Sequence, residues 1–154
     1  VASGTKEGWK QNALEFLRAS NFAGIAFGHA GCAAVHAMAY PLGGVHHIPH
    51  GQANQLMFAD VMRKYQEKKP IGKLNQLEEL LGAELDVEPV FSLENLYKLM
   101  DEVLKKDPLH EHGVTADELP VFAKNVIETQ QRLLGNNYVE LSEDDLLDIY
   151  RKAF

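Results

Sequence analysis

Residues 22–51 read FAGIAFGHAGCAAVHAMAYPLGGVHHIPHG, and this stretch joins a run of small apolar residues to a cluster of histidines. A buried imidazole needs hydrogen-bond partners or a lowered pKa, so a purely structural core gains nothing from imidazoles at this density. A metal ion or a reactive substrate would give a reason for them. Five of the chain's seven histidines lie here, namely His29, His36, His46, His47 and His50.

The composition around this stretch is that of an acidic globular domain. The 154 residues are 45% hydrophobic and 24% charged, with a formal net charge of −7. That charge argues against a nucleic-acid partner, because nucleic-acid binders present basic surfaces. The apolar run 22–39 approaches membrane-span length, but it is rich in Ala and Gly and contains two histidines, so we reject a span. The single Cys32 is expected to be a small buried thiol in a reducing, cytoplasmic compartment.

Helical spacing of the apolar residues predicts an all-α, bundle-like domain of six or seven helices. Residues 1–6 are expected to be a tail or a cut linker, and 7–154 the helical domain. The long helix is expected to stop at Pro41 before a Gly-Gly loop. The predicted helices cover 7–19, 22–40 with an irregularity near Gly28 and Gly31, 52–66, 74–81, 93–104, 116–134 and 143–154.

Four residues are expected to mark helix ends. Gly82 would stop the helix that begins at 74, and Ser92 would cap the next one. Thr115 with Glu118, and Ser142 with Asp145, have the spacing of capping boxes.

Two short motifs resemble the iron-containing alcohol dehydrogenase family. They are Val-His-Ala-Met-Ala-Tyr-Pro-Leu-Gly-Gly (35–44) and Ile-Pro-His-Gly-Gln-Ala-Asn (48–54). The order of the predicted helices is similar to the C-terminal half of that family over nearly the whole chain. The resemblance therefore implies the C-terminal half of a two-domain dehydrogenase, whose dinucleotide-binding domain is not part of this sequence.

The resemblance implies that His36 and His50 are metal ligands. Two more ligands, an Asp and a His, would come from a helix outside this sequence. Fe(II) suits mixed imidazole and carboxylate ligands, with Zn(II) as a competitor. In the family the metal is a Lewis acid at the alcohol oxygen, and hydride is exchanged with NAD or NADP, which the missing domain would mainly bind.

The resemblance also suggests three residues on the substrate side. Phe27 lies where family members often carry an aromatic residue facing substrate and nicotinamide, although simple helix packing is an equal alternative. Tyr40 replaces a histidine that many relatives carry, and a phenol is a poorer proton shuttle near neutral pH than an imidazole. Of the pair His46 and His47, one is expected to face the cleft, with His47 preferred, unless both brace the loop.

The other three histidines are not expected to bind the metal directly. His29, seven residues before His36, is expected to line the cleft or support a ligand. His110 and His112 are expected to be solvated.

The resemblance implies a metal-dependent dehydrogenase of a primary alcohol. The combination of Ala-Tyr-Pro-Leu-Gly-Gly (39–44) with the histidine pair resembles family members that interconvert 4-hydroxybutyrate and succinate semialdehyde. An imidazolium at this position could pair with the substrate carboxylate. The alternatives are an enzyme for a neutral alcohol or diol, and a non-catalytic helical module that binds a metal or a partner. The expected partners are the alcohol or aldehyde, the chain's own N-terminal domain and further copies in a homo-oligomer, with no nucleic acid and no membrane.

Overall fold

The computed structural model describes residues 6–154, with side chains from residue 8 onward. These residues group into two compact units, which meet at Cys32 and Ala33 in the sequence. The described part of the first unit contains α1 (Lys6–Gln11) and α2 (Ala13–Ala30). Apart from Lys6, the predicted tail over 1–6 lies outside the described residues. The single domain predicted over 7–154 stays a prediction.

The second unit contains the remaining helices. No strand occurs in residues 6–154, which confirms the all-α prediction. Two short helices, α1 and α8, raise the number of helices above the six or seven predicted. The elements of this unit are α3 (Ala34–His46), α4 (His50–Lys68), α5 (Lys73–Leu85), α6 (Pro89–Val103), the 3₁₀ turn η1 (Leu109–His112), α7 (Glu118–Thr129), α8 (Gln131–Leu134) and α9 (Glu143–Ala153).

The break predicted between residues 19 and 22 is wrong, because α2 continues through it to Ala30. The predicted helix over 22–40 is interrupted at one of the two glycines where an irregularity was expected. It breaks at Gly31, whose φ of 78° lies in a region that favours glycine, and α3 begins only at Ala34. The backbone N–H of Ala34 donates to Oδ1 of Asn137 over 2.8 Å. A side chain that is distant in sequence therefore satisfies one of the free N–H groups at the start of α3.

The prediction that the helix stops at Pro41 is wrong. Helix α3 continues through Pro41 and the two glycines to His46. Proline removes one helical hydrogen bond, but the fully buried Leu42 that follows it anchors the next turn in the core. The helix ends where His47 adopts a left-handed conformation with φ of 56°.

Two predicted helix ends are also wrong. Gly82 does not stop α5, which continues to Leu85. A Cβ at Gly82 would lie 2.9 Å from the carbonyl oxygen of Val87, so glycine here permits close approach of the chain that leads into α6. Helix α6 begins at Pro89, three residues before Ser92, because proline is well suited to the first position of a helix.

The other two caps agree better with the prediction. Ser142 and Asp145 form the full capping box of α9. Glu118 accepts hydrogen bonds from the backbone N–H and the hydroxyl of Thr115, at 2.7 and 3.0 Å. Helix α7 nevertheless begins at Glu118 rather than at residue 116, after a turn.

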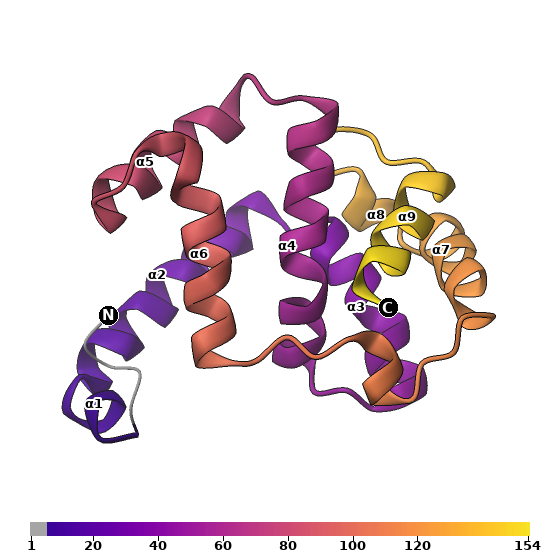
Figure 1. The fold of residues 1–154 in the computed structure, drawn as a ribbon, viewed down its shortest axis with the longest axis horizontal. Helices are drawn as coiled ribbons and strands as arrows, with labels where there is room; N and C mark the ends of the chain where they lie inside the picture. The colour runs from indigo at the N-terminus through magenta and orange to yellow at the C-terminus, as the bar shows by residue number, and fades with distance from the viewer. Residues whose placement is uncertain (1–5) are drawn as a thin grey trace. The chain divides into compact units, whose positions relative to one another are not determined.

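Helix α4 is the centre of the second unit. In Figure 1 it lies between the α5–α6 hairpin and the group formed by α7, α8 and α9. Helix α3 packs against α4, and α9 packs against both α4 and α7. The fully buried large side chains come mainly from these elements: Met38, Leu42, Leu56, Met57, Val61, Leu93, Leu109, Val126, Leu146, Ile149 and Tyr150.

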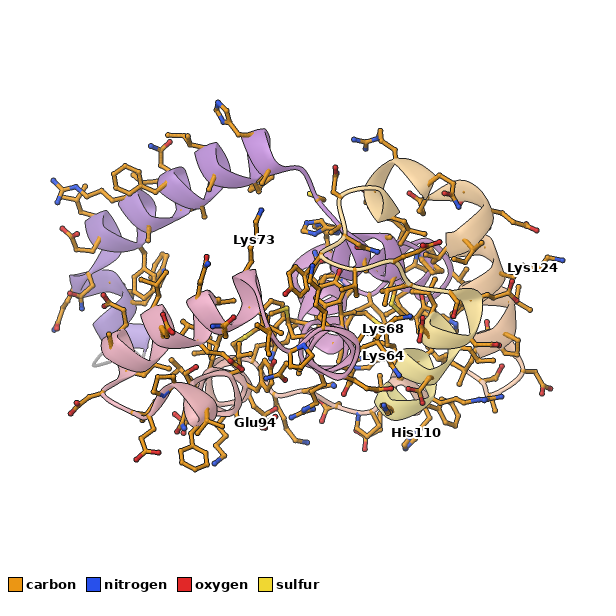
Figure 2. All side chains as sticks on the ribbon, turned by 90° about the horizontal axis from the view of Figure 1, so that it is seen from above. Lys64, Lys68, Lys73, Glu94, His110 and Lys124 are labelled. Carbon is orange, nitrogen blue, oxygen red and sulfur yellow. The ribbon has the colours of Figure 1, made fainter. Side chains whose placement is uncertain are left out.

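Ion pairs join α4 to α9 along one edge of this core. The ammonium group of Lys64 is buried and lies 2.6 Å from Asp148 and 2.8 Å from Glu67. One turn later, Lys68 pairs with Asp145. Figure 2 shows both lysines beside the last helix. The paired carboxylates satisfy the charge of Lys64, which burial would otherwise penalise.

No single helix in residues 6–154 is both long and apolar enough to cross a membrane. Within the described residues, Ala13–Ala30 and Ala34–His46 reach that length and apolar content only when taken together, and they are separate helices.

Replacing Ser92 by alanine should stabilise the second unit by about 1 kcal/mol. Its Oγ is fully buried within α6 and has no hydrogen-bond partner among the described residues, so the hydroxyl has lost water without compensation. Urea unfolding of Ser92→Ala against the parent chain measures the effect. The exposed Ser142, a true cap, is the matched control, and Ser142→Ala should destabilise by about 1 kcal/mol. A destabilised Ser92→Ala would contradict this account.

Candidate metal-binding site

His36 and His50 lie together although 14 positions separate them in the sequence. His36 is in the first turn of α3, and His50 is the first residue of α4. Because α3 and α4 pack against each other, the two rings meet with their centroids 5.2 Å apart and their planes inclined by 56°. The structure therefore brings together the two residues that the motifs single out as metal ligands.

The surroundings of His36 favour its neutral form. Partial burial, and after it the neighbouring His50, lower the pKa of His36 below its ordinary value. A neutral imidazole keeps a lone pair on one ring nitrogen, which is the form that binds metal ions. His36 is therefore prepared as a nitrogen donor.

Asn54 fixes the ring of His50. Its Nδ2 lies 3.0 Å from both Nε2 and the carbonyl oxygen of His50, one helical turn earlier. Because the amide donates, Nε2 of His50 acts as the acceptor, and a cation bound at this nitrogen would take the place of the amide hydrogen. The Oδ1 of Asn54 is buried without a hydrogen-bond partner among residues 6–154.

Tyr40 completes this group of rings. It lies one turn after His36, and its ring is nearly parallel to that of His50, with an interplanar angle of 23° and centroids 6.4 Å apart. The side chain is 43% exposed. Tyr40 thus forms one wall beside the imidazole pair and remains open to small molecules from solvent.

His46 and His47 have different surroundings. Nε2 of His46 lies 3.1 Å from Glu118, and its ring packs edge-on against Phe122 with centroids 6.0 Å apart. His46 therefore braces the end of α3 against α7. His47 ends α3 in the left-handed conformation and is exposed. Of the two, only His47 is available for contact with a substrate.

Phe27 and His29 belong to α2, in the first unit. Phe27 is 57% exposed, and Nδ1 of His29 lies 2.9 Å from the carbonyl oxygen of Ile25 in the same helix. Because the two units are described separately, the roles predicted for both residues stay predictions. Cys32, expected to be buried, is partly exposed. It lies where the chain leaves α2.

His110 and His112 are not both solvated. His110 is exposed, with its ring against Phe154 and its Nδ1 bonded to the carbonyl oxygen of that residue. His112 is half-buried, and its Nε2 has no partner in the described part of the chain. The spacing of His110 and His112 in the sequence did not predict this difference in burial, because the 3₁₀ turn η1 places the two rings in different environments.

The donor set fits part of a metal site. No group of three or more His, Cys, Asp or Glu side chains in the described residues could hold an ion. Two adjacent imidazoles suit a divalent transition metal whose other ligands are supplied from elsewhere, because such ions bind nitrogen and accept mixed ligands. His36 and His50 could therefore contribute two nitrogen donors to such a site.

The contacts that Asn54 and Glu118 make with histidines were not predicted from the sequence. Asn54 lies inside the second motif, four residues after His50, and this spacing on a helix would have indicated contact. Glu118 was recognised only as a capping residue. Its contact with His46 spans 72 positions, and no local signal predicts it.

In this all-α unit, two helices bring a pair of imidazoles together. The class of protein that this arrangement indicates is a helical domain with donors for a metal ion. The comparison with known families gives a more specific assignment. Residues 8–154 match the model described as the Fe-containing alcohol dehydrogenase family, C-terminal. The chain belongs to this family.

Two curated relatives show what kinds of enzyme resemble the chain. It is 44% identical over 140 residues to the 4-hydroxybutyrate dehydrogenase of Clostridium kluyveri, a match that covers 91% of this chain and 38% of that protein. It is 34% identical over 158 residues to long-chain-alcohol dehydrogenase 1 of Geobacillus thermodenitrificans, covering 100% of this chain and 39% of that protein. The chain therefore spans less than two fifths of these relatives.

Solved structures agree with the assignment. The crystal structure of a 1,3-propanediol oxidoreductase superposes with a TM-score of 0.65 at 25% identity, over 79% of this chain and 32% of that one. An archaeal halo-thermophilic alcohol dehydrogenase from a Red Sea brine pool gives 0.64 at 26% identity, over 80% and 33%.

Proposed function

We propose that this chain is the metal-binding and substrate-side domain of an NAD(P)-dependent alcohol dehydrogenase, in which His36 and His50 hold a catalytic ion. The observation that carries the proposal is the meeting of these two imidazoles, 5.2 Å apart, within a family of iron-containing alcohol dehydrogenases. Fe(II) is the proposed ion, with Zn(II) as the competitor. When bound, the ion supplies Lewis-acid polarisation of the alcohol group.

The chain's own residues prepare the site around the substrate. Neutral His36 offers a nitrogen lone pair, and Asn54 orients the His50 ring before an ion takes the place of its amide hydrogen at Nε2. Tyr40 provides a flat wall and a hydroxyl that can donate a hydrogen bond to the substrate or to water. Phe27 is proposed to face the nicotinamide. Positioning of this kind contributes to catalysis because reacting groups must be aligned before they react.

The proposed substrate pair is 4-hydroxybutyrate and succinate semialdehyde. Two observations support it: the 44% identity to a 4-hydroxybutyrate dehydrogenase, and the exposed His47 at the turn between the two ligand-bearing helices. A protonated imidazole at this position can pair with the carboxylate at the far end of the substrate. A neutral alcohol or diol has no group for this pairing.

The rest of the protein would supply the other contributions. We propose that an N-terminal domain binds most of the NAD or NADP and provides the remaining metal ligands. We also propose a homo-oligomer, since large apolar side chains of α2 such as Phe16, Leu17 and Phe22 are exposed and suit burial in contacts between chains. The proposed compartment is the cytoplasm.

Replacing His47 by alanine tests the substrate assignment. In the full-length protein, His47→Ala should lower kcat/KM for 4-hydroxybutyrate about tenfold and leave kcat/KM for 1,4-butanediol nearly unchanged, because only the acid loses a charged partner. Initial rates on both substrates give the ratio. His110→Ala removes an exposed imidazole of η1 and serves as the control.

An unchanged ratio in His47→Ala would refute the carboxylate pairing. If the parent protein also preferred the diol, the neutral-alcohol alternative would replace it. Absence of any NAD(P)-linked turnover in a metal-loaded full-length protein would favour the non-catalytic module.

A further inference from the structure

A pocket lies between α4 and α6 in the second unit, on the side of α4 away from His50. It encloses about 220 Å³. Ala59, in its wall, is nine residues after His50, and nine residues at 3.6 per turn place the two roughly opposite on the helix. The pocket is lined by Gln55, Phe58, Ala59, Arg63, Glu94, Tyr97, Lys98, Met100, Asp101 and Lys106.

Most of the charged groups of this pocket are already paired. Arg63 makes two hydrogen bonds to Glu94, at 3.0 and 2.9 Å, and a third to the buried Asp60. Lys106 also pairs with Asp60. The Oδ1 of Asp101 accepts from the backbone N–H of Lys106 at 2.6 Å. These contacts fix the wall, and they leave few polar groups to recognise a ligand.

The hydroxyl of Tyr97 is one group left over. Tyr97 is only 7% exposed, and its oxygen is buried without a hydrogen-bond partner among the residues that the structure describes. Its ring is held by the edge of Phe58, with centroids 6.1 Å apart, and by the Arg63 guanidinium 5.0 Å from its centroid. Burial raises the pKa of Tyr97, so the group stays a neutral O–H donor. A buried donor without an acceptor costs free energy that a ligand could recover.

Lys98 is the second group left over. It follows Tyr97 on α6, is exposed, and forms no ion pair or side-chain hydrogen bond within residues 6–154. Its charge acts on Glu94, whose pKa is lowered mainly by the hydrogen bond from Arg63 and, more weakly, by Lys98. An O–H donor and an unpaired cation thus stand beside the apolar surfaces of Phe58, Ala59 and Met100.

We propose that this pocket binds a small carboxylic acid with a short apolar chain. The carboxylate would accept from Tyr97 and pair with Lys98, and the chain would lie against Phe58 and Met100. Arg63 and Lys106 are already paired with Asp60 and Glu94. Of the lining cations, Lys98 is the one without an ion-pair partner within residues 6–154, and a bound carboxylate would supply that partner. The volume accommodates an acid of about six carbons and excludes a nucleotide, since drug-sized ligands need 300 Å³ or more.

Hexanoate binding to the full-length protein tests this proposal, measured by ligand-observed NMR with 1-hexanol and hexylamine as uncharged and cationic analogues. Hexanoate should bind at least about tenfold more tightly than either analogue. Tyr97→Phe should weaken hexanoate about tenfold, because it removes one hydrogen bond to a charged acceptor. Lys98→Met should weaken it severalfold and reduce its salt dependence. Lys124→Met, on α7 and far from Glu94 in Figure 2, should have no effect.

Two further measurements test whether hexanoate binds in this pocket. In His50→Ala, hexanoate should still bind, because His50 lies across α4 from the pocket. Tyr97→Phe should not lower the melting temperature, because it removes an unsatisfied hydroxyl. Weaker hexanoate binding by this variant would then reflect the loss of the hydrogen bond from Tyr97. The proposal is overturned if the parent protein does not bind hexanoate, if Tyr97→Phe binds it unchanged, or if His50→Ala abolishes binding.

Discussion

Replacing His50 by alanine in the full-length protein should lower kcat/KM for its alcohol by about a thousandfold or more and reduce bound metal to a small fraction. The ring of His50 lies beside that of His36, and the proposed site uses both as nitrogen donors. Losing one ligand removes the ion or misplaces it, and Lewis-acid catalysis contributes several kcal/mol to the barrier. Elemental analysis of the purified protein and initial rates with added Fe(II) or Zn(II) measure both effects.

His36→Ala should behave in the same way, and the double variant should be no worse than either single one, because the two residues act as a unit. His110→Ala provides a matched control, since its exposed imidazole lies on η1 against Phe154. Full metal content together with full turnover in either single variant would show that the replaced imidazole does not bind the ion.

Replacing Tyr150 by alanine should destabilise the second unit by about 3–5 kcal/mol, the usual cost of deleting a buried aromatic side chain. Tyr150 is fully buried on α9, its ring packs edge-on against Phe122 with centroids 5.9 Å apart, and its hydroxyl donates to the carbonyl oxygen of Met38 over 2.7 Å. Met38 is two residues from His36, so this contact also supports the helix that carries a ligand. Urea unfolding of the domain measures the loss.

Tyr150→Phe separates the hydroxyl from the ring. It keeps the packing against Phe122 and removes only the hydrogen bond, so the expected cost is about 1 kcal/mol. If Tyr150→Ala cost no more than Tyr150→Phe, the ring would not be part of the core described above.

That His36 and His50 lie together could be predicted from sequence, because both residues lie in short motifs around one helix junction. The fold class could also be predicted from the sequence, since apolar residues recur at helical spacing through most of the chain. The residues at which helices end and begin were harder to predict from the sequence. The end of α2 depends on Gly31, whereas the start of α3 depends on Asn137, which is more than a hundred positions away.

The errors have physical causes. Pro41 usually ends a helix, but the burial of Leu42 carries α3 past it. Pro89 and Ser92 both mark possible starts of α6, and the helix begins at Pro89. A proline in the first turn lacks only an N–H that would be unpaired anyway. Ser92, the rival cap, became a buried hydroxyl inside the helix. His46 and His47 could not be told apart until the contact between His46 and Glu118 was known.

The most direct test of the account is the position of the metal in crystals of the full-length protein. An anomalous difference map collected at the absorption edge of the loaded ion should show one peak within about 2.2 Å of a ring nitrogen of His36 and of His50, the bond length expected for imidazole ligands. A fully occupied ion bound to neither ring would contradict the claim that these two histidines hold the catalytic metal.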